Sequence, residues 1–331
     1  MDPCIEDTVS KALSGAVCGR EECIAMLSVP EDSPEAERVV SAASALVRDR
    51  TRGIGRIGAQ IGVIIGPCYA DCGFCAFASS VYSDEEYVMK PGDLAHYIER
   101  LTSDHKVSDI SLMTVHNYEF DDLVELVGAA KAVIPEGVGL AINTGDLSPS
   151  ECAELRSAGA ETAYHALRLG ESIDNSLEPL GRYETIRNLK DAGFRVVTGV
   201  EPIGPEHSPE EMADLYFRAL EGGCDACSAS AREPVPGTRM FSLPAISPAR
   251  LKQIRSAFIL STAWCDRTEL GFYGGYYGGF NRIMAEYLAS PKDVNDITEK
   301  GLGRTVSWAE NELKNNGFDY LALSDGSTVG L

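Results

Sequence analysis

The apolar positions divide the chain into two regions of different periodicity. Over the first 50 residues they recur at helical spacing, and we predict helices over residues 9–16, 20–27 and 34–50. The third helix has Ser33 as its N-cap and Pro34 at its first position, where a missing N–H costs no helical hydrogen bond. We therefore interpret residues 1–55 as an N-terminal helical extension.

From about residue 56, short apolar runs alternate with longer segments of helical periodicity, which is typical of a parallel α/β domain. The predicted strands cover residues 61–66, 107–114, 138–144, 162–168, 195–202, 226–232 and 268–273, with a weaker eighth at 292–297. The predicted helices cover residues 91–103, 120–133, 148–158, 181–193, 208–222 and 247–263. This order predicts a (β/α)8 TIM-type barrel, closed or slightly open, over residues 56–300, with a C-terminal helix and tail at 301–331 packed on it.

The chain is strongly acidic, with 29 Lys and Arg against 50 Asp and Glu and a formal net charge of −21. Such a surface repels phosphate backbones and anionic lipids, so we expect neither nucleic acid nor membrane as a partner. The amino-terminal residues resemble no secretory signal, and no apolar run is long enough to span a bilayer. We therefore expect a cytoplasmic protein, whose 10 cysteines serve metal binding, catalysis or packing rather than disulfides.

Three cysteines follow the first predicted barrel strand at close spacing. The apolar run ends at Gly66 and Pro67, and then come Cys68, Cys72 and Cys75, separated by three and by two residues. Thiolates select zinc, copper(I) or iron–sulfur clusters. A structural zinc site needs four ligands, whereas three cysteines on a [4Fe–4S] cluster leave one iron open for a substrate or cofactor. Free or zinc-bound thiols are the alternative interpretation.

This Cys-x3-Cys-x2-Cys loop, with Phe74 just before its last cysteine, resembles the cluster loop of the radical S-adenosylmethionine (SAM) superfamily. The resemblance implies a [4Fe–4S] cluster on Cys68, Cys72 and Cys75 whose open iron binds SAM. It also implies that an electron from the cluster cleaves SAM to a 5′-deoxyadenosyl radical, which abstracts hydrogen from the substrate. The implied partners are a small-molecule substrate and an electron donor such as ferredoxin or flavodoxin, in an anaerobic setting.

Residues 25–300 are also similar in order and spacing to the biotin-synthase-like branch, which includes biotin synthase, methylornithine synthase and a hydrogenase maturase. This similarity implies that Arg182 pairs with the SAM carboxylate and that Glu171 receives its amino group. It further implies that Phe74 lies against the adenine and that Gly199 permits close approach of the nucleoside. For Arg182 the alternative is a solvated arginine on a helix surface.

Two segments look closer to an archaeal group linked to biosynthesis of the iron-guanylylpyridinol cofactor. They are residues 164–171 and the run at 200–207, which is followed by a Pro-Val-Pro-Gly-Thr segment at 234–238. The founding members of that group have five residues in the first spacing of the cysteine loop, whereas this chain has three. The resemblance implies a small precursor in cofactor biosynthesis as the substrate.

Polar side chains stand at the carboxyl ends of the predicted strands, where barrel enzymes carry their chemistry. His165 and Arg168 lie on the fourth predicted strand and Glu201 on the fifth. We take these three residues as candidates for substrate binding or proton transfer. A buried histidine with internal partners is the alternative for His165.

Sulfur insertion of the biotin or lipoyl type is one alternative function. Biotin synthases hold a second cluster through cysteines on strands 2, 3 and 5, and the corresponding residues 110–113, 140–143 and 195–198 contain none, which disfavours this function. Cys224 and Cys227 could bind metal or change redox state. They lie at the start of the sixth predicted strand, opposite the candidate site, and we interpret them as structural thiols. A non-catalytic iron–sulfur protein is the other alternative.

Overall fold

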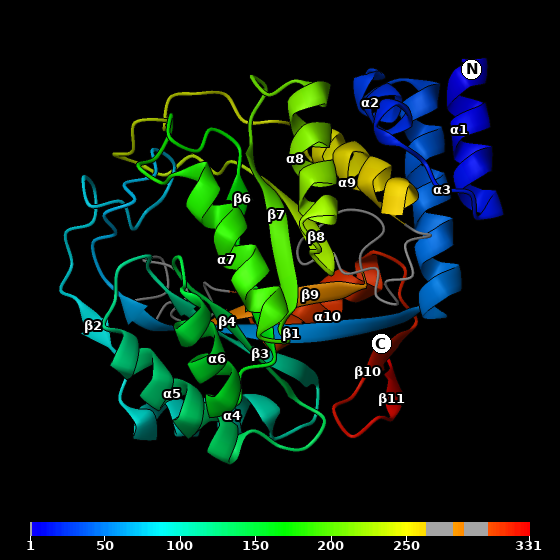
Figure 1. The fold of residues 1–331 in the computed structure, drawn as a ribbon. Coiled ribbons are helices and arrows are strands. Elements are labelled where there is room, and N and C mark those ends of the chain that lie inside the picture. The colour runs from blue at the N-terminus through cyan, green and yellow to red at the C-terminus, as the bar shows by residue number, and fades with distance from the viewer. Residues whose placement is uncertain (1, 263–280, 288–303) are drawn as a thin grey trace.

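The structure is a computed structural model that describes residues 2–262, 281–287 and 304–331. Its centre is a curved parallel sheet whose strands follow one another in the order β9, β1, β3, β4, β5, β7 and β8 (Figure 1). The strands are β1 (Ile54–Ile65), β3 (Val107–Thr114), β4 (Gly139–Asn143), β5 (Thr162–Tyr164), β7 (Arg195–Ile203), β8 (Ala226–Ala231) and β9 (Arg282–Tyr287). Among the described residues β8 and β9 are not paired, so the sheet is an open barrel there. The predicted α/β barrel is confirmed in its slightly open form.

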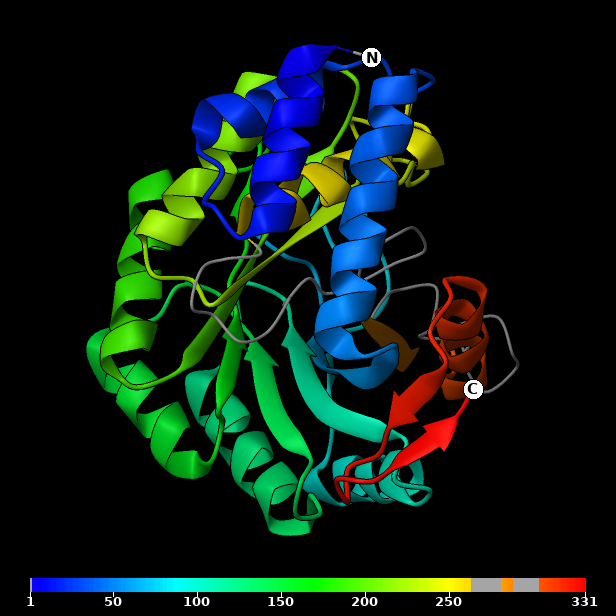
Figure 2. The same ribbon diagram turned by 90° about the vertical axis from the view of Figure 1, so that its right-hand side faces the viewer.

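The helices between the strands cover the outer face of the sheet (Figure 2). They are α4 (Pro91–Thr102), α5 (Phe120–Val133), α6 (Pro149–Ala158), α7 (Pro179–Asp191), α8 (Pro209–Glu221) and α9 (Pro248–Thr262). The caps explain two of the starting points, because Ser148 and Ser208 each accept a backbone N–H three residues later. Every one of these helices runs back from the carboxyl ends of the strands, which therefore share one rim of the barrel.

The N-terminal segment forms α1 (Pro3–Ser14), α2 (Arg20–Ser28) and α3 (Pro34–Thr51), which pack on α8 and α9 at one side of the barrel (Figure 1). The predicted first helix at 9–16 was placed too late, because Asp2 caps a helix that starts at Pro3. Gly15 then ends this helix at a φ of 94°, in the left-handed region that favours glycine. In the described parts of the chain, no helix is long and apolar enough to cross a membrane.

Three strand predictions were wrong. The strand predicted at 162–168 is divided into β5 and a separate short strand at 167–168. The first strand was predicted at 61–66, but β1 begins at Ile54 because glycines and polar residues interrupt its apolar pattern. The strand β9 was not predicted at all. Arg282 and Glu286 of this strand pair with Asp109 and Arg304, so charged side chains interrupt the apolar run that marks a buried strand. The predicted strands at 268–273 and 292–297 lie outside the described residues.

The C-terminal segment contains the expected helix, α10 (Val306–Asn315), and a hairpin that was not predicted. Strands β10 (Tyr320–Ala322) and β11 (Thr328–Gly330) form this hairpin, and β10 pairs in parallel with the start of β1. Two further short strands lie at the carboxyl rim. They are β2 (Tyr87–Val88), antiparallel to the end of β1, and β6 (Leu167–Arg168), which pairs with β7.

Candidate active site

The three predicted ligand cysteines line one pocket at the carboxyl rim of the barrel. The pocket has a volume of about 210 Å³ and lies where β1 ends and its loop begins. The Sγ atom of Cys68 accepts the His116 backbone N–H at 3.4 Å, and that of Cys75 accepts the Phe77 backbone N–H at 3.4 Å. Such donors stabilise the thiolate form that a metal requires. The loop therefore supplies a thiol-lined pocket with backbone donors already aimed at two sulfurs.

Burial favours the protonated form of two of these thiols, Cys72 and Cys75. It raises the pKa of Cys72 to about 11 and also raises the pKa of Cys75. A metal would have to displace their protons. No three His, Cys, Asp or Glu side chains in the described part of the chain are arranged to hold a metal ion. In a [4Fe–4S] cluster each thiolate binds a different iron, so the sulfurs can lie farther apart than they can around a single ion. Thiols spread around one pocket therefore fit a cluster.

Arg182 lies at the side of the same pocket and is 3% exposed. Its Nη1 donates to Asp146 Oδ1 at 2.8 Å, and its Nη2 donates to the Ala166 carbonyl at 2.8 Å. Its Nε lies 3.4 Å from Glu171 Oε1. The alternative of a solvated helix arginine is therefore wrong, although the prediction that Arg182 binds the SAM carboxylate stays a prediction.

Glu171 is brought beside Arg182 by the turn after β6. Its Oε1 accepts the Arg168 backbone N–H at 3.2 Å, and its side chain is 6% exposed. Burial raises the pKa of Glu171 even though Arg182 is close. A cationic ligand would stabilise the ionised form of this carboxylate, because a second positive charge would offset more of the cost of its desolvation.

Asp146 is the residue that the sequence analysis did not select. It follows β4 and lies between Arg182, His165 at 3.4 Å and His116 at 3.9 Å. Burial alone would raise the pKa of Asp146, but the ion pair with Arg182 lowers it, and the pKa lies well below its usual range. Its position just after a strand end was the available signal, since several other strand ends carry chemistry-bearing residues.

His165 is 1% exposed, and neither ring nitrogen has a hydrogen-bond partner among the described residues. Its Nε2 is 3.4 Å from Asp146 Oδ1 but makes no hydrogen bond with it. Burial, with Arg182 nearby, lowers the pKa of His165 to about 3, so the ring is neutral at pH 7. The structure thus places His165 beside the carboxylate and not in either barrel cavity.

Arg168 lies between the thiol pocket and a second cavity deeper in the barrel, and it lines both. Its Nη1 donates to Glu201 Oε1 at 2.9 Å. Its guanidinium carbon lies 5.6 Å from the centre of the Phe74 ring, within cation–π range. Phe74 packs against the apolar cluster that contains Cys68 and Cys72 and lies beside the arginine that separates the two spaces, and its contact with the adenine stays a prediction.

The second cavity, which we call the inner cavity, has a volume of about 290 Å³. Its described walls are mainly polar and come from β1, β3, β4, β5, β7, β8 and β9. They include Gln60, Asp109, Ser111, Asn143, Thr162, Tyr164, Arg168, Glu201, Ser228, Ser230, Glu286 and Arg304. Both carboxylates and guanidinium groups face it, so it suits a small polar molecule with charged groups.

Gly199 lies on β7 beside this cavity. A Cβ atom there would come within 2.6 Å of the Tyr164 hydroxyl and 2.7 Å of Ser228 Oγ. The absent side chain thus makes room for these two residues, and the close approach of a nucleoside stays a prediction. Arg232, another polar strand end, pairs with Glu206 and donates to the Pro244 carbonyl at 2.9 Å, so it ties loops together.

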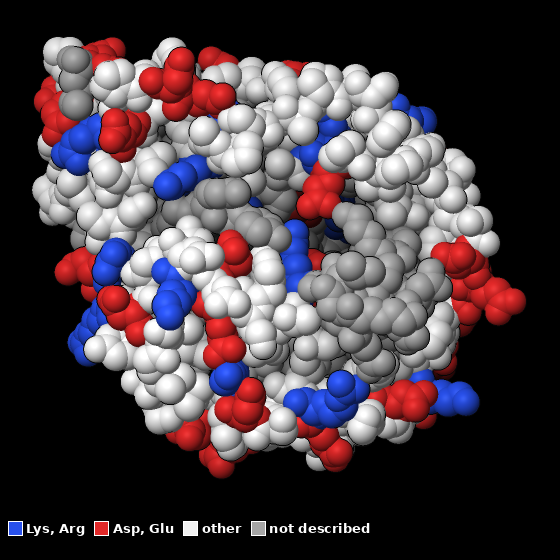
Figure 3. All heavy atoms as spheres, turned by 180° about the vertical axis from the view of Figure 1, so that it is seen from behind, with Lys and Arg blue, Asp and Glu red and all other residues white. Residues whose placement is uncertain are grey.

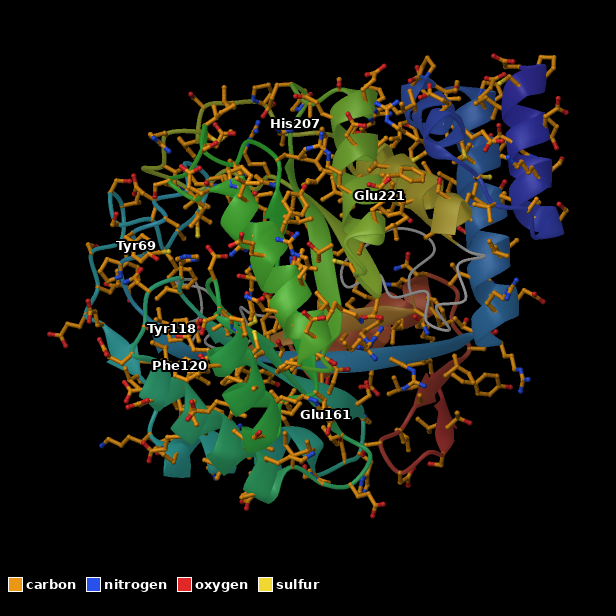
Figure 4. The ribbon with its side chains drawn as sticks, in the orientation of Figure 1. Tyr69, Tyr118, Phe120, Glu161, His207 and Glu221 are labelled. Atoms are coloured by element: carbon orange, nitrogen blue, oxygen red, sulfur yellow. The ribbon has the colours of Figure 1, made fainter. Side chains whose placement is uncertain are left out.

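A third hollow, of about 520 Å³, opens on the outer side of the thiol pocket. Tyr69, Tyr118 and Phe120 line it and lie on the side of the molecule that carries β2 (Figure 4). Its polar walls are mostly carboxylates. Ile65, Val115 and His116 line both this cleft and the thiol pocket, so one layer of side chains separates them.

The remaining buried cysteines lie in the scaffold. Cys224 and Cys227 are 0% and 3% exposed and belong to the main hydrophobic core, as do Cys18, Cys23 and Cys152. Cys227 Sγ donates to the Ser228 carbonyl at 3.4 Å, and burial raises its pKa well above the usual value. This environment favours structural thiols, because a buried protonated thiol is inert.

Comparison with known proteins gives one family and several distant relatives. Residues 63–219 match the family described as the radical SAM superfamily. The biotin synthase of Desulforudis audaxviator (strain MP104C) is 26% identical over 203 residues, which cover 59% of this chain and 61% of that protein. The structure of methylornithine synthase (PylB) aligns with a TM-score of 0.76 at 17% identity, covering 94% of this chain and 96% of that one. HydG, a maturase of the [FeFe]-hydrogenase, aligns with a TM-score of 0.75 at 14% identity, covering 96% and 75%.

Proposed function

The chain belongs to the radical SAM superfamily of enzymes and resembles its biotin-synthase-like branch, and on that premise we propose that Cys68, Cys72 and Cys75 hold a [4Fe–4S] cluster that binds SAM. The observation that carries the proposal is that all three thiols line one pocket together with Arg182. When bound, the reduced cluster and SAM supply a 5′-deoxyadenosyl radical that abstracts hydrogen from a substrate.

The chain's own residues would hold the amino acid end of SAM. The Arg182 guanidinium suits a carboxylate, and the buried Glu171 carboxylate suits an ammonium group. Asp146 and the Ala166 carbonyl hold Arg182 from behind, so that its orientation is fixed before the ligand arrives. Phe74 packs beside Cys68 and Cys72, and its aromatic face would support the adenine.

The substrate would occupy the inner cavity, next to the thiol pocket and behind Arg168. The cavity presents carboxylates from Glu201 and Glu286 and a guanidinium from Arg304. We take the substrate to be a small polar molecule that carries charged groups, and a precursor in the biosynthesis of a cofactor. Biotin synthases, which match by sequence, make a cofactor by name. A low-potential carrier such as ferredoxin or flavodoxin would provide the electron.

Hydrogen abstraction without sulfur insertion fits the inner cavity better than the biotin-type reaction does. No cysteine lines this cavity among its described residues. The strands β3, β4 and β7, which would carry ligands for a second cluster in biotin synthase, supply Ser111, Asn143 and Val197 instead. The structure therefore favours a single cluster per chain.

Anaerobic reconstitution tests this function. We expect about four irons per chain, and 5′-deoxyadenosine after addition of SAM and dithionite. Cys72→Ala should lose the cluster and the product, whereas Cys152→Ala, a core thiol on α6, should keep both. One zinc and no iron per chain, or no product from cluster-loaded protein above the Cys72→Ala background, would contradict the proposal and favour a non-catalytic metal protein.

A further inference from the structure

The Pro-Val-Pro-Gly-Thr segment at 234–238 forms a turn in the connection between β8 and α9. Its two prolines restrict φ, and the Thr238 backbone N–H and hydroxyl both donate to the Val235 carbonyl, at 3.2 and 2.8 Å. The next residue, Arg239, reaches the loop that holds the three cysteines, because its side chain bonds to the main chain there (Figure 1). The turn therefore brings a guanidinium from the far edge of the sheet to the candidate cluster loop.

Arg239 joins two loops that are distant in sequence. Its Nη2 donates to the Asp71 carbonyl at 3.2 Å and to the Asp174 carbonyl at 2.8 Å. Two backbone hydrogen bonds run beside these contacts. The Gly73 N–H donates to the Asp174 carbonyl at 2.8 Å, and the Met240 N–H donates to the Gly73 carbonyl at 2.8 Å. The guanidinium thus has one partner in the cysteine loop and one in the turn after β6.

Both carbonyls lie next to residues of the candidate site. Asp71 immediately precedes Cys72, and its φ of 46° is uncommon for a residue other than glycine. Such a conformation persists where the surroundings hold it in place. Asp174 closes the turn that presents Glu171, because its N–H donates to the Gly170 carbonyl at 2.7 Å. One guanidinium therefore bridges the backbone beside a candidate ligand and the turn that carries Glu171.

Arg239 bonds to the main chain rather than to a carboxylate. Over much of the surface seen from behind, Lys and Arg side chains lie beside Asp and Glu side chains (Figure 3). Arg239 is exposed, yet no carboxylate of the described residues lies within ion-pair distance of it. A surface ion pair contributes little to stability, whereas a cation that donates to two backbone carbonyls links two main-chain segments directly. The contacts therefore indicate a role in holding the loops and not in balancing a surface charge.

We infer that Arg239 is a positioning residue that aligns the cysteine loop with the site for the amino group of SAM. This inference rests on the proposed function, in which Cys72 binds an iron and Glu171 receives the ammonium group. SAM would have to contact the open iron and Glu171 together. A ligand with two attachment points binds more weakly when their separation varies. Arg239 itself contacts neither group and acts through the two carbonyls.

Removing the guanidinium should loosen this alignment without separating the loops. The backbone hydrogen bonds of Gly73 and Met240 do not depend on the Arg239 side chain. Hydrogen bonds within the cysteine loop also remain, because the Cys75 N–H donates to the Cys72 carbonyl at 3.0 Å. The cluster should therefore still bind, while SAM binds less tightly.

The test compares Arg239→Gln with the wild type and with Arg187→Gln in the cluster-loaded enzyme. Arg187 lies on α7 and is 67% exposed, so it is the matched control and should change nothing. Gln is polar but lacks the charge and length of Arg, and its loss of a charge-assisted contact should raise KM for SAM about fivefold. The kcat for 5′-deoxyadenosine with dithionite should change less than about twofold, because binding and not cleavage is affected.

Two further readouts do not depend on turnover. Iron content should be unchanged in Arg239→Gln, and the change that SAM causes in the EPR spectrum of the reduced cluster should require about fivefold more SAM. Hydrogen exchange followed by mass spectrometry should be about fivefold faster in peptides that contain Gly73 or Met240. Exchange in β4 should not change, which would show that the variant is folded.

An unchanged KM for SAM in Arg239→Gln would overturn the inference. Loss of iron, or faster exchange throughout the barrel, would also overturn it, because Arg239 would then support the loop or the fold as a whole and not the alignment of two sites. An equal rise in KM for Arg187→Gln would have the same meaning. No product from the cluster-loaded wild type would instead reject the proposed function, and the exchange rates would still show whether Arg239 holds the two loops together.

Discussion

The thiol pocket and the inner cavity hold their arginines in different ways. Arg182, at the thiol pocket, has Asp146 and Glu171 within ion-pair distance and donates to a backbone carbonyl, and it is almost fully buried. Arg168, at the inner cavity, pairs with Glu201, and its side chain is 25% exposed. The first arrangement fixes a guanidinium before any ligand binds. The second arrangement leaves the Arg168 guanidinium able to exchange Glu201 for a group of the ligand. A cofactor pocket needs a fixed guanidinium, and a cavity for a reacting substrate benefits from one that can exchange its partner.

The largest expected effect comes from removing the fixed arginine. Arg182→Met keeps the volume but leaves Asp146 and Glu171 without their shared cation. Unpaired buried charges cost several kcal/mol, and because Asp146 is 35% exposed we expect a lower free energy of unfolding by about 3 kcal/mol. Denaturant titration of the metal-free protein measures it. Arg187→Met, on the same helix and 67% exposed, should change stability by less than about 0.5 kcal/mol. Equal stability of the two variants would show that Arg182 is not held as described.

The second effect is a pH dependence carried by Asp146. Burial would raise the pKa of Asp146, but the ion pair with Arg182 holds it below its usual value of 3.8. A lowered folded-state pKa stabilises the protein above the unfolded-state value and loses this effect as the pH falls toward the folded-state value. Asp146→Asn should therefore be less stable than the wild type at pH 7 by about 1–3 kcal/mol. The difference should shrink below about pH 4. A difference that stays constant with pH would show that the charge of Asp146 is not what matters.

The third effect separates the inner cavity from the thiol pocket. Glu201→Gln keeps the shape but removes the charge that pairs with Arg168. We expect substrate-dependent turnover to fall about tenfold, which corresponds to one charge-assisted hydrogen bond. Cleavage of SAM without substrate should change less than about twofold, because Glu201 does not line the thiol pocket. Product analysis for both reactions measures this. Equal losses in the two reactions would show that the thiol pocket and the inner cavity act as one site.

The sequence predicted the parts of this site that depend on local spacing, and it missed those that depend on side chains meeting across the barrel. Cys68, Cys72 and Cys75 were predictable because a single loop presents all three. Most helices were predictable because prolines and serine caps mark their starts. Asp146 was not selected, because its role depends on its pairing with Arg182, which lies on a helix 36 residues later in the sequence.

The same reasoning explains the errors in the fold. Arg282 and Glu286 on β9 have their partners on β3 and in the segment before α10, and a sequence pattern does not show those partners. The early half of β1 contains Gly58, where a Cβ atom would come within 2.5 Å of Asp109. A neighbouring strand therefore requires the glycine that weakened the strand pattern. The strand conformation of these segments depends more on their pairing partners than on local propensity.

The smallest effect tests whether the thiol pocket is the only cluster site. Cys227 lies on β8 opposite Thr198 of β7 and is packed in the core, and its thiol donates to a backbone carbonyl. Cys227→Ala should lower the free energy of unfolding by about 1–2 kcal/mol through lost packing. The iron content and the yield of 5′-deoxyadenosine should not change, whereas Cys68→Ala should lose both. A fall in iron in Cys227→Ala, with SAM cleavage retained, would establish a second cluster in the scaffold. It would also return sulfur insertion to consideration, because a second cluster is the sulfur source that the described walls of the inner cavity lack.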